Sequence, residues 1–433
     1  MLVLMWKRRA PANVQQFYSP EFSMPSIANL KPADRISILR QRQTEKMARS
    51  AHAYVRGSTT NFYRWLGTQK RDVLPEGPAV WICGDCHAGN LGPIADDEER
   101  VKVQIRDLDQ TVIGNPAHDL IRLALSLVTA SRGSNLPGVT ASKILEHMID
   151  GYAEAVRDEK VLLVMPATIR TVVKKSTQRT WKHLAHERIG DVTPQIPIGK
   201  RFWPLLKAEK RAIAGLFAET DINNLVTSLH TRDDDGKVEC VDAAYWMKGC
   251  SSLGLMRLAA LVKITSKKNT QYSLIDIKEA VNAAAPRYPD AAMPKDNAKR
   301  VVEGARQLSP NLGERMVAAR LDKTSVFVRE LMPQDLKFEI EDLTVDEAVG
   351  VASFLAGVVG RAHARQMDDA TRKSWIMELS KGRTKSLDAP SWLWSSVVAL
   401  IAEHEVAYLE HCRKYANSTA VSVRDSSKRS RCE

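Results

Sequence analysis

The 433-residue chain has few cysteines, few aromatic residues and no long apolar run. Its six cysteines are scattered between Cys83 and Cys432, which excludes a disulfide scaffold and favours a reducing compartment. No apolar stretch approaches the roughly 18 residues of a membrane span, and Lys7, Arg8 and Arg9 follow too short an apolar run for a secretion signal. We therefore expect a cytoplasmic protein without a membrane span.

The overall composition is that of a globular protein. Hydrophobic residues make up 44% and charged residues 26%, which excludes disordered and collagen-like classes. No repeat at a fixed period is present, so solenoids and propellers are excluded as well. The length allows two or three domains or one two-lobed enzyme.

The chain is basic, with 63 Lys and Arg against 51 Asp and Glu and a net charge of +12. Such a charge attracts nucleic acid, an acidic membrane or a phosphorylated ligand. Because the basic residues lack interleaved aromatic residues, we interpret most of them as a solvated surface. A basic cluster at 170–182 keeps association with nucleic acid as an alternative, and a Ser-rich basic tail at 416–433 is typical of a disordered end.

Polar residues gather at the ends of two predicted strands. The apolar run 79–83 predicts a buried strand, and the alternation over 101–106 predicts a half-buried strand that forms a hairpin with it. After the turn 114–116, the spacing of Leu120, Leu123 and Leu127 predicts a helix with Asp119 as its N-cap.

The most specific motif is Gly84-Asp85-x-His87-x-x-Asn90, followed by Asp107 and Asp109 at the end of the next strand. Phosphoryl transfer requires a carboxylate directed at the acceptor hydroxyl and oxygen ligands for Mg²⁺. These residues supply both at one sheet edge. The alternative interpretation is an ordinary turn, in which Asp and Asn are favoured.

This segment resembles the catalytic loop of protein-kinase-like phosphotransferases of the aminoglycoside and choline kinase type. The resemblance implies that Asp85 is the catalytic base, with His87 in the same loop, and that Asn90 and Asp107 hold Mg²⁺. Asp109 competes for the second metal position, and the later Asp119 is implied to brace the loop. The sequence departs from the pattern at Cys83, where a His is usual.

A kinase also needs a glycine-rich loop and a lysine for the ATP phosphates, and these come after the catalytic loop in this chain. Gly249 and Gly254 lie in a predicted strand-turn-strand, and Lys278 ends the next strand. Glu303, on a predicted helix, is a candidate to orient Lys278, with Glu279 and Glu314 as competitors. A structural hairpin is the alternative for the two glycines.

We therefore predict an α+β, two-lobed protein-kinase-like fold that is circularly permuted, with a mostly helical larger lobe. The hypothesis requires Lys278 to lie within a nucleotide's length of Asp107, and the helices at 140–235 are expected to form the acceptor pocket. The predicted division is an extension at 1–49, a catalytic-loop lobe at 50–235, a β-rich glycine-loop and lysine lobe at 236–340, helices packing on the larger lobe at 341–415, and the tail at 416–433.

The same stretches resemble a bacterial family, domain of unknown function 2252. The matching segments are 53–57, 84–90, 107–109, 275–280, 300–304, 328–331 and 360–365. The resemblance supplies no activity, so the predicted ATP- and Mg²⁺-dependent transfer to a small-molecule hydroxyl is a hypothesis. A nucleotide-binding pseudokinase or regulator is one alternative. Another is a haem or zinc site, because Cys83-x-x-Cys86-His87 satisfies the C-x-x-C-H pattern.

Overall fold

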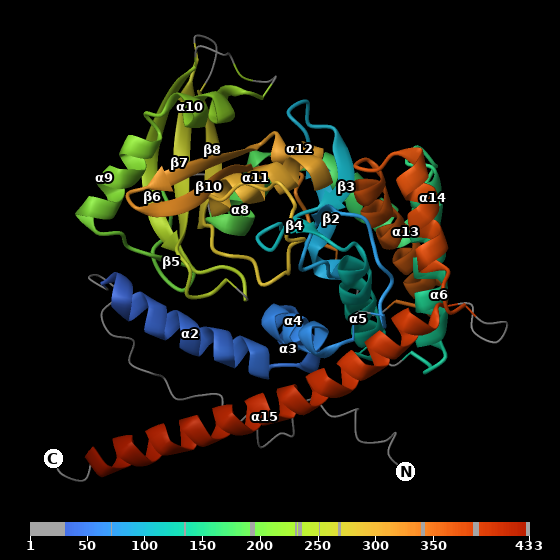
Figure 1. Ribbon diagram of the computed structural model, residues 1–433. Coiled ribbons are helices and arrows are strands. Elements are labelled where there is room, and N and C mark those ends of the chain that lie inside the picture. Colours follow the sequence, from blue (N-terminus) through green and yellow to red (C-terminus); the bar gives the residue numbers. More distant parts are fainter. Residues whose placement is uncertain are drawn as a thin grey trace.

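The computed structural model describes residues 31–70, 72–133, 136–190, 195–229, 232, 236–250, 252–266, 270–338, 343–383 and 389–429. These residues form a mixed α/β arrangement, in which one antiparallel sheet lies beside a larger group of helices (Figure 1). Residues 1–30 of the predicted extension at 1–49 lie outside the described residues.

The large sheet contains six described strands in the order β5-β6-β7-β8-β10-β9. All neighbouring pairs are antiparallel. The bounds are β5 Phe202–Trp203, β6 Lys237–Trp246, β7 Arg257–Thr265, β8 Thr270–Glu279, β9 Met316–Leu321 and β10 Thr324–Leu331. The predicted strand-turn-strand around Gly249 and Gly254 corresponds to β6 and β7, and the predicted strand that ends at Lys278 corresponds to β8.

Helices cover both faces of this sheet because its side chains alternate between them. Ile275 and Ile277 of β8 belong to a core formed with α9 (Lys207–Leu216) and α10 (Thr220–Thr227). Leu274 faces the opposite side, where it packs in a cluster with Leu184 of α8 (Trp181–Arg188). Asp276 and Lys278 continue on this second face, which also faces the candidate site.

Two further pairs of short strands lie outside the large sheet. Strand β1 (Val80–Ile82) pairs with β4 (Val112–Gly114), and β2 (Leu91–Ala95) pairs with β3 (Val101–Ile105). The predicted hairpin between the strands at 79–83 and 101–106 is therefore wrong. The chain instead turns back at 96–100, where Glu99 adopts a positive φ of 61°.

The helical part is built around α6 (Thr140–Arg157) and α13 (Val345–Ala364), which pack closely. Glycines permit this approach: a Cβ added to Gly151 would lie 2.4 Å from the Ser353 carbonyl oxygen, and one added to Gly360 would lie 2.6 Å from the Tyr152 carbonyl oxygen. Further helices of this part are α5 (Ala117–Gly133), α7 (Ala167–Thr177), α11 (Asn297–Leu308), α12 (Pro310–Gly313) and α14 (Asp369–Leu379). Segments from both halves of the chain therefore share one core.

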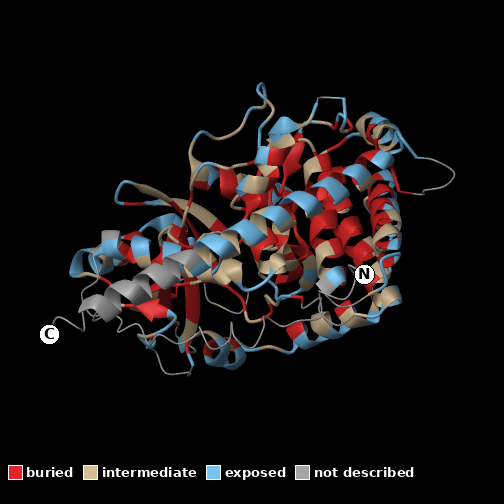
Figure 2. Ribbon diagram, turned by 90° about the horizontal axis from the view of Figure 1, so that it is seen from below, coloured by how far each residue is buried: buried red, intermediate tan, exposed pale blue. Residues whose placement is uncertain are grey.

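The N-terminal and C-terminal helices lie along one side of the molecule (Figure 1). They are α2 (Pro32–Ala48), α3 (Ala51–Gly57), α4 (Thr59–Thr68) and α15 (Ser391–Arg429). Over residues 391–416, exposed residues form the outer face of α15, over the buried interior (Figure 2). The sequence predicts a disordered tail at 416–433, but the helix continues to Arg429 because no Gly or Pro interrupts it; residues 430–433 lie outside the described part.

Within the described part of the chain, every helix is too short or too polar to cross a bilayer. This agrees with the absence of a predicted membrane span.

Candidate functional site

A cleft of about 180 Å³ lies where the large sheet meets the helical part. The predicted residues Asp85, Asn90, Asp107 and Asp109 all line it. The remaining described lining residues are Gln43, Gly57, Thr59, Thr60, Gln110, Ser252, Leu255, Glu279, Ala280, Val281, Ala284, Val301 and Phe327. The helices at 140–235, predicted to form an acceptor pocket, contribute none of these residues. The polar groups of this cleft come from α2 to α4 and from the strand ends.

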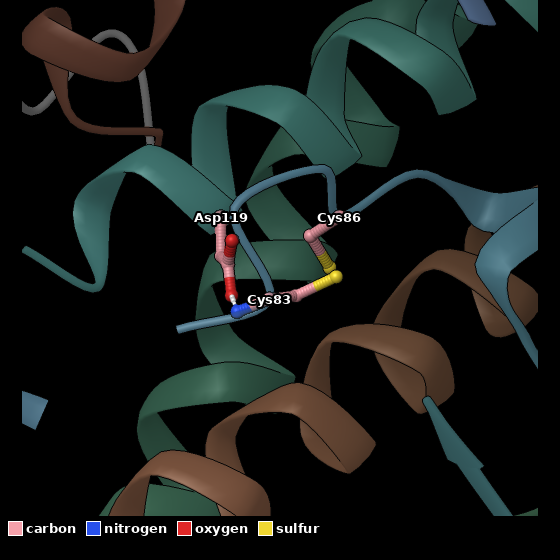
Figure 3. A group of neighbouring side chains, drawn as sticks. All are labelled: Cys83, Cys86 and Asp119. Atoms are coloured by element: carbon pink, nitrogen blue, oxygen red, sulfur yellow. Dashed lines mark hydrogen bonds between the residues drawn. The ribbon is translucent and has the colours of Figure 1, made fainter. Parts of the chain in front are cut away.

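The loop that carries Asp85 is held by the buried carboxylate of Asp119. Asp119 Oδ2 accepts a hydrogen bond of 2.7 Å from the Cys83 backbone N–H, and Oδ1 accepts one of 2.9 Å from that of Gly84. Figure 3 shows the carboxylate facing the Cys83 nitrogen. The predicted bracing role of Asp119 is confirmed, but its predicted N-cap position is wrong, because α5 begins at Ala117.

Asp85 lies at the buried end of the cleft and forms an ion pair with Arg122. Arg122 Nε lies 2.9 Å from Asp85 Oδ1, and the side chain of Arg122 is 1% exposed. The guanidinium also donates to the Val55 carbonyl oxygen. Burial raises the pKa of Asp85, and Arg122 partly offsets this effect. The carboxylate is therefore fixed in position and more basic than an exposed one.

The other two polar residues of the loop lie in different environments. Asn90 Nδ2 donates to the Asp85 carbonyl oxygen at 3.0 Å, so its side-chain oxygen is directed as an acceptor. His87 is 4% exposed and is not among the lining residues. Burial, together with Arg122 and Arg56, holds the pKa of His87 well below its usual value. The structure therefore places Asn90 at the cleft and His87 beneath the loop.

Lys278 is in contact with both predicted metal-binding carboxylates. Its ammonium lies 3.3 Å from Asp107 Oδ1 and forms a shorter contact with Asp109 Oδ2. The Lys278 side chain is 3% exposed, whereas that of Asp107 is 44% exposed. Lys278 and Asp107 are 171 residues apart in the sequence, so two distant segments converge here, as the circular-permutation hypothesis requires.

The two carboxylates differ in basicity. The partial burial of Asp107 opposes its ionisation, but Lys278, Arg329 and Arg257 together outweigh this effect and keep the pKa of Asp107 well below its usual value. Burial and the neighbouring Asp107 raise the pKa of Asp109 to about 7. When two close carboxylates share one ammonium, the pKa of one falls and the pKa of the other rises, because the first negative charge opposes ionisation of the second group.

A buried ion cluster fixes the strand that carries Lys278. The fully buried Asp276 accepts hydrogen bonds from Arg257 Nε at 2.8 Å and from Arg329 at 3.0 and 3.1 Å. The two guanidinium groups outweigh the effect of burial and hold the pKa of Asp276 well below its usual value. Because Asp276 and Lys278 share a face of β8, this cluster also sets the position of the lysine.

The glycine-containing loop joins β6 to β7 next to Lys278. Gly249 and Gly254 have positive φ angles of 94° and 104°, which other residues rarely adopt. Lys46 Nζ of α2 donates to the Gly249 carbonyl oxygen at 2.9 Å. Ser252 and Leu255 bring the loop to the cleft.

Glu303 does not lie next to Lys278 in the described part of the structure. Its side chain contacts Gln307 at 3.2 Å and Arg306 at 3.8 Å on the outer face of α11. Asp107 and Asp109 take the place predicted for Glu303 as partners of Lys278. The helical pattern of α11 gives the reason, because Glu303 lies opposite the buried stripe of Val301, Ala305 and Leu308.

The cysteine pair of the loop was the basis of the zinc and haem alternatives. Cys83, Cys86 and Asp119 bring three ligand atoms within 4.8 Å of one another, but both carboxylate oxygens already accept backbone N–H groups. The sulfur atoms face each other (Figure 3). A hydrogen bond with Cys86 and burial raise the pKa of the Cys83 thiol well above its usual value, which opposes metal binding as a thiolate. The group also lacks a fourth ligand among the described residues, unlike a structural zinc site.

Two arginines of the site are absent from the sequence prediction. In the sequence, Arg122 is a cation among the apolar residues of α5, and this pattern could have marked it as a site residue. The structure buries its side chain fully. Arg300 of α11 donates to the backbone oxygens of Asp109 at 3.1 Å, Val281 at 2.8 Å and Thr111. It therefore connects α11 to the segment that carries the two carboxylates.

Comparison with known proteins identifies the family. The model of domain of unknown function 2252, described as an uncharacterised protein conserved in bacteria, matches residues 35–414. No curated protein and no solved structure matches the chain. The chain therefore belongs to the domain of unknown function 2252 family.

Proposed function

For this member of the family, we propose an ATP- and Mg²⁺-dependent phosphotransferase that acts on the hydroxyl group of a small molecule. The observation that carries the proposal is the convergence of Asp85, Asn90, Asp107 and Asp109 on one cleft, with Lys278 directly behind the last two. The set contains a candidate base, three oxygen ligands and a cation, which are the groups that phosphoryl transfer uses.

The donor set fits Mg²⁺. Asp109 Oδ1 is buried and has no hydrogen-bond partner in the described structure, and the Asn90 amide nitrogen is already held by the Asp85 carbonyl oxygen. Asn90, Asp107 and Asp109 would hold the ion, because Mg²⁺ binds through oxygen ligands. When bound, Mg²⁺ would neutralise charge on the phosphates of ATP. Lys278 supplies one positive charge next to the two carboxylates.

Asp85 is the proposed general base. It accepts the proton of the acceptor hydroxyl while the oxygen forms a bond to the γ-phosphorus and the bond to the bridging oxygen of ADP breaks. The products are a phosphate ester, ADP and one proton. The raised pKa of Asp85 brings its basicity closer to the neutral range, and Arg122 fixes its orientation. The main contributions are positioning and electrostatics.

The order of elements supports a kinase-like lobe. In protein kinases a glycine-rich loop covers the phosphates, a lysine follows on the third strand, and a helix supplies its glutamate partner. Here the glycine-containing loop joins β6 and β7, Lys278 lies on β8, and α11 follows. The lysine partners are Asp107 and Asp109 in place of a helix glutamate, so the proposed site differs from that pattern in this respect.

A nucleotide-binding regulator without turnover is the second candidate function. The ion pair between Arg122 and Asp85 favours it, because one oxygen of the proposed base is already occupied. Both candidates bind Mg²⁺-ATP, and only the first consumes it.

Calorimetric titration of the purified full-length protein with ATP, with and without Mg²⁺, tests nucleotide binding. A screen of hydroxylated metabolites for stimulated ATP consumption then tests turnover. We expect Asp85→Asn to lower turnover by about 10² to 10⁴-fold and to bind Mg²⁺-ATP within about twofold of the wild type. Loss of the general base with an intact nucleotide site produces this separation.

The matched control is Asp150→Asn, which removes an exposed carboxylate that pairs with Arg383 on the surface. It should leave both ATP binding and turnover unchanged. Absence of Mg²⁺-ATP binding by the wild type contradicts both candidate functions. Binding without turnover selects the regulator, and full turnover by Asp85→Asn shows that the assigned base is wrong.

A further inference from the structure

A small cationic cavity lies on the opposite side of the β3 end from the cleft. Its volume is about 20 Å³, which is the size of one small ion or one to two waters and far too small for a nucleotide. Arg106 lines this cavity, whereas its neighbour Asp107 lines the cleft. The other lining residues are Ile94, Leu184, Arg188, Lys248, Leu312, Arg329, Leu331, Met332 and Asp335.

The positive charges of this cavity are not balanced by its single acid. Arg106, Arg188, Lys248 and Arg329 face one carboxylate, Asp335. Both oxygens of Asp335 are already bound by Arg315 at 3.1 Å. Arg329 pairs with Asp276, and Arg188 pairs with Glu187 at 3.0 Å, so Arg106 and Lys248 are the cations of the cavity wall that form no described ion pair.

Two guanidinium donors in the cavity wall have no hydrogen-bond partner in the described structure. Arg106 Nε and Arg188 Nε are buried and have no hydrogen-bond partner. The Lys248 ammonium lies 4.1 Å from the Trp246 ring centroid and makes no described ion pair. Buried N–H groups are rarely left unpaired in folded proteins, so an acceptor from outside the chain is expected here.

The electrostatic environment of the cavity also favours binding of an anion. Burial lowers the pKa of Lys248 well below its usual value, and the nearby Arg257 and Arg188 lower it further. The cations therefore repel one another, and a bound anion relieves this repulsion.

We propose that this cavity binds one tetrahedral oxyanion, inorganic phosphate or the phosphate group of a small monoester, through Arg106, Arg188 and Lys248. Guanidinium groups bind phosphate oxygens through paired N–H donors, and an ammonium adds a point charge. The walls from Leu184, Leu312 and Leu331 limit the ligand to a single phosphate group. The site is separate from the proposed nucleotide cleft and does not depend on its function.

The test is calorimetric titration of the full-length protein with sodium phosphate, and separately with glycerol phosphate, against sodium chloride of equal ionic strength. We expect saturable binding of at least one phosphate compound, and the comparison identifies which source the site accepts. Lys248→Met and Arg188→Gln should each weaken this binding about tenfold or more, since each removes a charged contact. In phosphate-free buffer Lys248→Met should melt no lower than the wild type, because one repelling charge is gone.

Two control variants separate this cavity from other basic sites. Lys182→Met removes an exposed cation on α8, the helix that carries Arg188, and should bind phosphate like the wild type. Asp150→Asn, which removes an exposed surface carboxylate outside the cavity, should also leave phosphate binding unchanged. The proposal is overturned if the wild type responds to phosphate no more than to chloride, or if Lys182→Met weakens binding as much as Lys248→Met.

Discussion

Replacement of Asp119 by Asn tests the support of the loop that carries Asp85. The Asp119 carboxylate is fully buried and accepts the backbone N–H groups of Cys83 and Gly84, while His363 Nε2 lies 3.2 Å from Oδ2. An asparagine has the same shape but presents an NH₂ group in place of one oxygen. At least one backbone N–H then faces another donor.

The expected loss of stability follows from these contacts. A hydrogen bond to a charged group contributes about 1.5–3 kcal/mol, and a buried donor left without a partner costs about 1–3 kcal/mol. Allowing for some relaxation of the loop, we expect Asp119→Asn to lower the free energy of unfolding by about 3–5 kcal/mol. This is a large part of the stability of a typical protein.

Urea unfolding at pH 7 measures this change, with Asp150→Asn as the matched control. Asp150 pairs with Arg383 at the surface, and its side chain is 59% exposed, so its replacement should change stability by less than about 1 kcal/mol. Hydrogen exchange provides a second measurement, since the amides of Cys83 and Gly84 should exchange faster in Asp119→Asn. Equal stability of the two variants would refute the bracing role.

Two further predictions concern backbone conformation and pH. Gly84 has a φ of 74°, and an added Cβ would lie 2.1 Å from the Gln110 carbonyl oxygen, so Gly84→Ala should lower the unfolding free energy by about 2 kcal/mol or more. Gly67→Ala, in the open part of α4, should raise it by up to about 1 kcal/mol, and urea unfolding that ranks the two variants in the opposite order rejects this explanation. The folded-state pKa of Asp276 lies below its unfolded value of about 3.9, so its contribution is fully present above that pH and is lost as the pH falls toward the folded-state pKa. The difference in unfolding free energy between the wild type and Asp276→Asn should therefore shrink from pH 5 to pH 3, and a constant difference contradicts the assignment.

Much of the large sheet could be predicted from its sequence, because its strands have regular apolar patterns with turn residues between them. Strand β2 was missed since Gly92 and Pro93 interrupt its pattern. Proline tolerates a strand only where its missing N–H is not needed, and the two-stranded pair of β2 with β3 provides such a position. The error in the predicted hairpin followed directly from this omission.

The members of the site were predicted better than their partners. The spacing of Asp85, Asn90 and Asp107 depends on local chain geometry, which sequence motifs describe well. The partner of Lys278 depends on how α11 is rotated against the strands, and Arg300, not Glu303, faces inward. Arg122 was missed because its partner Asp85 lies 37 residues away, beyond any helical or strand period.

The close packing of α6 against α13 has a consequence for how the protein is synthesised. The groove at Gly151 is filled by a helix around Ser353, which leaves the ribosome about 200 residues later. At roughly 5–20 residues per second, the apolar side of α6 waits about 10–40 s for its permanent neighbour. Throughout that interval the apolar side of α6 is exposed in the nascent chain. Chaperones or the intervening residues must shield it until the second half has been translated.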